Sequence, residues 1–354
     1  FPITAAPFLH RMDLGLLLPL LTGLPRHLAL RGPRWMTYGT LLRPKGFGRW
    51  AAKWGITDQI AAAYTRALLQ AHRPPFRRTC FPEHDLRSHH HGPMRVGFSL
   101  RKIDASLRYI LESYGSVEKA LEEARWIVVG DHSQSAIGGF PNYSINMFKA
   151  LDSYRVAPLA EGRLEAGKYD LAIAPNDRGC LVYLPQGDRR LLLPLRHLFS
   201  RWESVDLLFW KEGNYTYAQS ARGQCRWRRG GGLWDEYRQS WEVDGDLTVV
   251  SVTTEEDRIR YHAYPDLFHR VDDLLGGPQA PDLALNAKPG YEFSTGFTMG
   301  KGNHGSLSRE DSLVPLLSCG IEMTEHPRVT DLVEVVLKEL GVPWPEHLTR
   351  RALR

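Results

Sequence analysis

The sequence is poor in cysteine and has no long apolar run, and both absences restrict the class of protein. Its 354 residues include only 4 cysteines, which are scattered and form no CxxC pair. A zinc ribbon and a thioredoxin-type redox motif are therefore excluded. The best apolar run, Leu14 to Leu21, contains Pro19 and is shorter than the ~18–20 residues of a membrane-spanning helix. No signal-peptide cleavage pattern follows, so we expect a cytoplasmic protein without a membrane span.

Other absences concern whole functional classes. The chain has no Gly-x-Ser-x-Gly nucleophile elbow, no P-loop and no Rossmann fingerprint. Its 45 Lys and Arg residues exceed its 40 Asp and Glu residues by only five, and no long basic run occurs. Nucleic acid is therefore not indicated as a partner. An apolar content of 43% and a charged content of 24% are globular values, which exclude disorder, collagen and coiled coil.

The pattern of apolar residues predicts an α/β protein. Thr57 is the expected N-cap of one helix, a second follows helical spacing from Leu100 to Leu111, and residues 117–124 form a shorter one. Trp126 to Val129 reads as a buried strand. We expect the polar, histidine-rich residues 81–93 to be a loop.

The rest of the chain divides into two parts by composition. Residues 141–285 alternate short strand-like runs with glycine and proline turns. An α/β pattern then returns, ending in a helix capped by Thr330. We therefore predict an α/β core over 1–140, a β-rich insertion or cap over 141–285 and a return to the core over 286–354.

Three polar clusters follow or precede the predicted apolar elements, where open α/β sheets place their sites. They are Asp85 with His89, Asp131 with His132, and His304 in a glycine-rich loop. Each cluster alone is more often a solvated helix face, a turn with an aspartate cap or a simple glycine turn. Together they offer carboxylates and imidazoles, the mixed ligand set that suits zinc and similar ions. Two such ions about 4 Å apart would clamp a phosphoryl group.

The sequence around these clusters resembles the type I phosphodiesterase and nucleotide pyrophosphatase branch of the alkaline phosphatase superfamily. The family segment Asp-x-x-Gly-His-x-x-Gly-Pro corresponds to residues 85–93, where Ser88 replaces the first glycine. The family's Ser-Asp-His-Gly strand end corresponds to residues 130–133, and its Gly-x-His-Gly loop to residues 302–305. The resemblance covers most of the chain from about Phe81 onward.

This resemblance implies an alkaline-phosphatase-like sandwich with a central, mostly parallel sheet between helices and a β-rich insertion. It also implies that Asp85, His89 and His304 hold one metal ion, while Asp131 and His132 hold a second. The neighbouring His90 and His91 are expected to be exposed or to lie behind the ligands. The native ions are expected to be zinc, with manganese or magnesium as alternatives.

The nucleophile and one further ligand are harder to assign. The family has a threonine nucleophile and an N-terminal aspartate, and no matching aspartate-bearing strand precedes Phe1. The Phe-Pro approach to the nucleophile favours Thr4, whereas counting back from Leu21-Thr22-Gly23 leads to Asp13. We interpret the N-terminus as clipped or altered, and Thr4 is the candidate nucleophile. Its other interpretation is an ordinary exposed threonine.

The predicted function is hydrolysis of phosphoric esters, of phosphodiesterase or nucleotide pyrophosphatase type, through two metal ions and a covalent intermediate. The expected partner is a small phosphate ester or nucleotide. The alternative is a catalytically impaired or non-catalytic member of the fold that serves as a binding module. A sulfatase or phosphomutase ranks lower, since no Cys-x-Pro-x-Arg sulfatase signature occurs.

Overall fold

The computed structural model describes residues 57–139, 141–158, 164, 167–185, 188–298 and 300–344. These residues divide into two compact units, one with residues 57–87 and 96–126, the other with residues 88–95 and those from 127 onward. The model combines helices with a large sheet, which confirms the predicted α/β class. No helix among the described residues is both long and apolar enough to cross a membrane.

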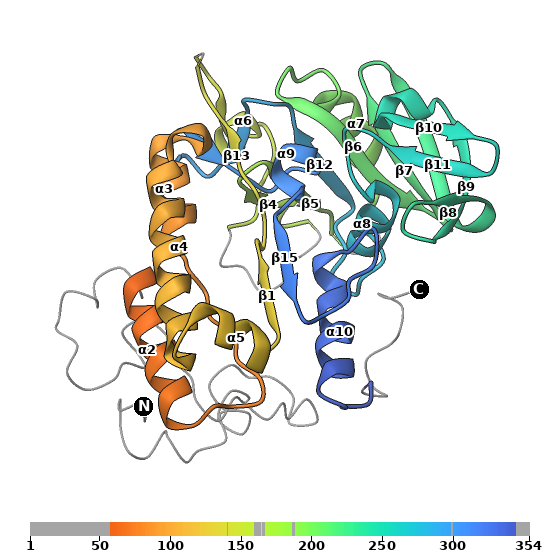
Figure 1. Ribbon diagram of the computed structural model, residues 1–354. Coiled ribbons are helices and arrows are strands. Elements are labelled where there is room, and N and C mark those ends of the chain that lie inside the picture. Colours follow the sequence, from red (N-terminus) through yellow and green to blue (C-terminus); the bar gives the residue numbers. More distant parts are fainter. Residues whose placement is uncertain are drawn as a thin grey trace. The chain divides into compact units, whose positions relative to one another are not determined.

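The first unit is helical (Figure 1). Its helices are α2 (Asp58–Ala71), α4 (Gly97–Leu111) and α5 (Val117–Glu123), as the sequence predicts. The Thr57 side chain caps α2 by accepting a hydrogen bond of 3.3 Å from the backbone N–H of Ile60. Apolar side chains of α2 and α4 form a small core, with Ala62, Leu69 and Ile110 buried.

Residues 81–93 are not the loop that the sequence predicts, because they contain helix α3 (Glu83–His91). A reciprocal pair of caps explains this helix. The N–H of Glu83 donates to Asp58 Oδ1, and the N–H of Asp58 donates to Glu83 Oε2, both at 3.1 Å. Each acidic side chain thus satisfies an unbonded N–H at the start of the other's helix. Since the two residues are 25 apart in sequence, no local pattern reveals the cap.

The second unit contains a nine-stranded sheet. Its strands in spatial order are β10 (Val252–Glu255), β11 (Arg258–Tyr261), β8 (Gly223–Asp235), β7 (Tyr215–Ser220), β6 (Val205–Glu212), β12 (Leu283–Ala287), β5 (Gly179–Tyr183) and β4 (Ala172–Asn176), while β9 (Ser240–Gly245) also pairs with β8. All nine strands lie within residues 172–287. The division into three predicted domains stays a prediction.

The strands of this sheet are mostly antiparallel. Within this described sheet only β11 and β8 pair in parallel, and the other ladders are antiparallel. These strands lie almost wholly in the range predicted for the β-rich insertion, residues 141–285, so the expected central, mostly parallel sheet stays a prediction. Short turns join β4 to β5, β6 to β7 and β7 to β8, whereas parallel neighbours need a crossover of a dozen or more residues.

Both faces of this sheet are buried, as strand β6 shows. Leu208 and Trp210 belong to a core cluster that includes residues of helix α7 (Leu192–Phe199). Leu207 and Phe209 belong to a second cluster with residues of helix α8 (Leu267–Leu274). Because successive side chains of a strand point to opposite faces, the central part of β6, residues 207–210, is continuously apolar rather than alternating.

Smaller elements complete the second unit. Strand β1 (Trp126–Val129) pairs with β15 (Leu316–Cys319), β3 (Ser144–Asn146) with β13 (Glu292–Ser294), and β2 (Ser135–Ala136) with β14 (Gly302–Asn303). The β1 side chains are half-buried or exposed, not buried on both faces as predicted. The remaining elements of the second unit are the helices α6 (Met147–Ala150), α9 (Arg309–Ser312) and α10 (Leu332–Glu339) and 3-10 turns at Pro93–Arg95, Leu247–Val250 and Val329–Asp331. A further 3-10 turn, Glu112–Tyr114, belongs to the first unit.

Two tryptophans of β8 test the importance of this packing. Trp227 is fully buried and its Nε1–H donates to the carbonyl of Phe268, whereas Trp234 is 43% exposed. We expect Trp227→Ala to lower the free energy of unfolding by about 3–5 kcal/mol, because it opens a cavity against α8. Trp234→Ala should change it by less than about 1 kcal/mol. Urea unfolding of both variants is the measurement, and equal losses would contradict this account of the core.

Candidate metal centre

Helix α3 places Asp85 and His89 one turn apart, on the same face. His89 is buried, and its Nδ1 lies 2.8 Å from the carbonyl oxygen of Gly302. A carbonyl oxygen can only accept, so Nδ1 carries the hydrogen and donates it. The lone pair of this imidazole is then on Nε2, the nitrogen that can act as a metal ligand. A backbone carbonyl in this role is the usual partner of a metal-binding histidine.

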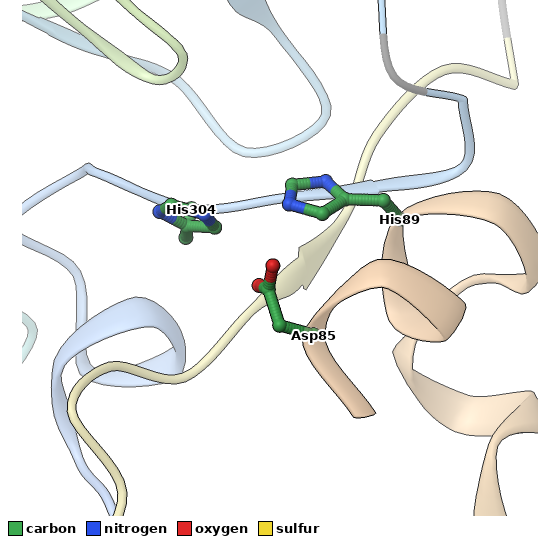
Figure 2. Close-up of side chains that lie close together, drawn as sticks. All are labelled: Asp85, His89 and His304. Carbon is green, nitrogen blue, oxygen red and sulfur yellow. The ribbon is translucent and has the colours of Figure 1, made fainter. Parts of the chain in front are cut away.

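His304 follows strand β14 and completes a group of three candidate ligands. Ligand atoms of Asp85, His89 and His304 all lie within 4.8 Å of one another. Figure 2 shows the Asp85 carboxylate pointing toward the two imidazole rings, whose centroids are 5.1 Å apart. Among the residues that the structure describes, this is the single group of three or more potential metal-binding side chains this close together.

His132 lies beside this group, just after strand β1. Its ring stacks on that of His304, with centroids 3.7 Å apart and planes 24° apart. Its Nδ1 lies 3.2 Å from the Ser133 carbonyl oxygen, so the same argument places the hydrogen on Nδ1 and the lone pair on Nε2. The antiparallel pairing of β2 with β14 brings the segments of His132 and His304 together.

The other predicted site residues are placed differently. Asp131 is exposed, and its Oδ1 accepts a hydrogen bond from the N–H of His132. It does not belong to the group of Asp85, His89 and His304. Thr4 and Asp13 lie outside the described residues. The metal-binding and catalytic roles of all these residues stay predictions.

The remaining histidines of helix α3 do not join the group. His90 and His91 are exposed, as predicted. The Ser99 hydroxyl donates to the Val96 carbonyl and accepts from Nδ1 of His84 at 2.7 Å. Burial lowers the pKa of the His84 imidazole, and the negative charges of Asp58 and Asp85 offset this effect only in part. Because its pKa lies below the ordinary value, this imidazole is neutral at pH 7. His84 therefore anchors α3 to α4.

Strand β14 approaches the end of α3 so closely that only glycine fits at residue 302. A Cβ added to Gly302 would lie 2.5 Å from the Ser88 carbonyl oxygen. The N–H of Lys301 donates to the His89 carbonyl at 2.7 Å. These contacts place the Gly302 carbonyl beside the His89 ring. The sequence marks the glycine-rich loop, but not this partner.

The basic run from Arg226 to Arg229 is of a kind that can bind phosphate, but here it is explained by the fold. It lies in strand β8, with Trp227 in the core. Arg226 pairs with Asp244 at 2.8 Å, Arg228 with Glu242 at 2.5 Å and Arg229 with Asp272 at 2.6 Å. Cross-strand and helix carboxylates therefore neutralise these cations.

This chain has weak structural matches to known proteins. No protein-family model matches the chain, and no curated protein matches its sequence. Two solved structures of phosphonoacetate hydrolase from Sinorhizobium meliloti 1021, with phosphonoformate and with phosphonoacetate, are 12% and 13% identical, with TM-scores of 0.42 and 0.41. Each match covers 80% of this chain and 55% of the other, so the chain spans about half their length. At this similarity, no functional residue is transferred from them.

Gly302 provides a test of how the group is held. We expect Gly302→Ala to lower the free energy of unfolding by about 1–3 kcal/mol, because its methyl group would overlap a backbone carbonyl that cannot move freely. The matched control is Gly97→Ala in helix α4, where an added Cβ meets nothing within 4 Å. This control should leave stability unchanged or raise it slightly. If both variants are equally stable in urea, the close approach of β14 to α3 is not present in solution.

Proposed function

We propose that this chain is a metal-dependent hydrolase of phosphoric esters, belonging to the alkaline phosphatase superfamily, with Asp85, His89 and His304 as ligands of one divalent ion. The observation that carries the proposal is the convergence of these three side chains within 4.8 Å, although His304 is far from the other two in sequence. The hydrogen bond from His89 Nδ1 to Gly302 supports it, since it orients the ring as metal sites require.

The donor set fits a catalytic ion better than a structural one. Two imidazoles and one carboxylate are a known zinc set with three protein ligands, which keeps a coordination position open. Cysteine ligands, which dominate closed structural zinc sites, are absent from this group. Zinc is therefore the proposed ion, and manganese and magnesium are the alternatives. A divalent ion bound here would polarise a phosphoryl oxygen and offset its negative charge.

We further propose that the enzyme resembles the type I phosphodiesterases and nucleotide pyrophosphatases in its reaction. In this proposal, Asp131 and His132 hold a second ion, Thr4 is the nucleophile that becomes phosphorylated, and the substrate is a small phosphate diester or nucleotide. The stacking of His132 on His304 supports a role for His132 near the same substrate. The order of the three sequence motifs supports the rest.

One observation favours the rival, a non-catalytic metal-binding module. The Asp131 side chain is exposed and bonds to the backbone of the next residue rather than lying with the other candidate ligands. A chain with one complete ligand group could bind an ion without hydrolysing an ester.

Metal binding is the first test. After loading with zinc and dialysis, we expect the wild-type chain to retain at least one equivalent, and His304→Ala and Asp85→Asn to retain much less, because each variant removes one of three ligands. His90→Ala is the matched control, since His90 is an exposed neighbour on the same helix. Elemental analysis measures the content. Equal zinc content in the wild type and in His304→Ala would contradict the assignment of His304 as a metal ligand.

Activity separates the enzyme from its rival. With excess zinc or manganese, we expect slow hydrolysis of bis(p-nitrophenyl) phosphate, because the second ion has only Asp131 and His132 as proposed ligands and catalytic zinc normally has three. His304→Ala and Asp131→Ala should reduce hydrolysis to the background rate, whereas His90→Ala should retain it. A zinc-loaded wild type without turnover on diester, monoester or phosphonate would support the non-catalytic module instead.

A further inference from the structure

A buried ion pair contacts the segments that carry His132 and His304, and no sequence motif predicts it. The side chains of Arg178 and Asp311 are 1% and 0% exposed, and Arg178 Nη1 lies 2.9 Å from both carboxylate oxygens. Arg178 belongs to the turn between β4 and β5 of the nine-stranded sheet, whereas Asp311 belongs to helix α9. Charges buried this completely need a full set of partners.

The partners of Arg178 come from several segments around the candidate site. Its Nη1 donates to the Ser135 hydroxyl at 2.6 Å, three residues after His132. Its backbone N–H donates to the carbonyl of His304 at 2.9 Å. Other guanidinium N–H groups donate to the carbonyls of Lys288 and Tyr291. Arg178 thus contacts the segment of His132 through its side chain and the loop of His304 through its backbone.

Asp311 also accepts hydrogen bonds from the segments of His132 and His304. Its Oδ2 accepts from the N–H of Ser306 at 2.9 Å, two residues after His304. Its Oδ1 accepts from the Ser135 hydroxyl. Its backbone carbonyl accepts from the N–H of Ser133 at 2.9 Å, directly after His132.

We propose that Arg178 and Asp311 are positioning residues that set the spacing between the His132 segment and the His304 loop. A pair that only added stability would need no bonds to these two segments, and such pairs can often be replaced by apolar residues without loss. The turn of the β4–β5 hairpin thus contributes to the site through its contacts with both ligand-bearing segments. The consequence for metal binding rests on the proposed function, whereas the positioning itself does not.

Amide hydrogen exchange in the metal-free protein tests the positioning alone. In Arg178→Met we expect exchange of the Ser133 and Ser306 amides to accelerate by about tenfold or more, because both donate to Asp311, Ser133 to its backbone carbonyl and Ser306 to its carboxylate, and Asp311 loses its counter-charge. Arg178→Lys keeps the charge and should show a smaller change. The control is Lys211→Met, which breaks a 2.9 Å pair between strand β6 and Asp272 of helix α8 and should leave both amides unchanged. Unchanged exchange in a folded Arg178→Met would overturn the proposal.

Zinc affinity tests the consequence. The apparent Kd should rise on the order of 10- to 100-fold in Arg178→Met, as for other residues that support a metal ligand, and stay at the wild-type value in Lys211→Met. An unchanged Kd in Arg178→Met would refute a positioning role for the metal site. A wild type that binds no zinc would refute the proposed function, and the exchange rates would still decide whether the pair sets the spacing.

Discussion

The hydrogen bond between His89 Nδ1 and the Gly302 carbonyl is the interaction on which the rest of the site depends. It joins helix α3 to strand β14 across 213 residues of sequence. It also determines which nitrogen of His89 carries the lone pair. Without the close approach at Gly302, His304 would not lie beside His89 and Asp85. A single hydrogen bond from a side chain to a backbone carbonyl therefore links the segments that carry the three candidate ligands.

The nine-stranded sheet has a part in this arrangement beyond that of an inserted cap. Its β4–β5 turn supplies Arg178, whose buried pair with Asp311 reaches the segments that carry His132 and His304. The sheet is itself held by two apolar clusters, one on each face. Polar contacts of this turn therefore join the sheet to the segments that carry the candidate ligands.

Features with a local cause could be predicted from the sequence, and features with a distant cause could not. Thr57 and the apolar spacing of α4 predict their helices, and the spacing of Asp85 and His89 predicts a shared helix face. The cap that starts α3 comes from Asp58, so the helix itself is not predicted. Strand runs are visible in the sequence, but the antiparallel order of the sheet depends on turns and on packing against α7 and α8. Arg178 and Asp311 are 133 residues apart and belong to no local motif.

The central claim is that a divalent ion binds to the imidazoles of His89 and His304 and the carboxylate of Asp85. X-ray absorption at the zinc edge tests it most directly, because imidazole rings give a characteristic scattering pattern beyond the first coordination shell. The account predicts nitrogen and oxygen ligands at about 2.0–2.2 Å, with at least two imidazoles, and one imidazole fewer in His304→Ala. Sulfur ligands at about 2.3 Å, or an identical spectrum for His304→Ala, would contradict it.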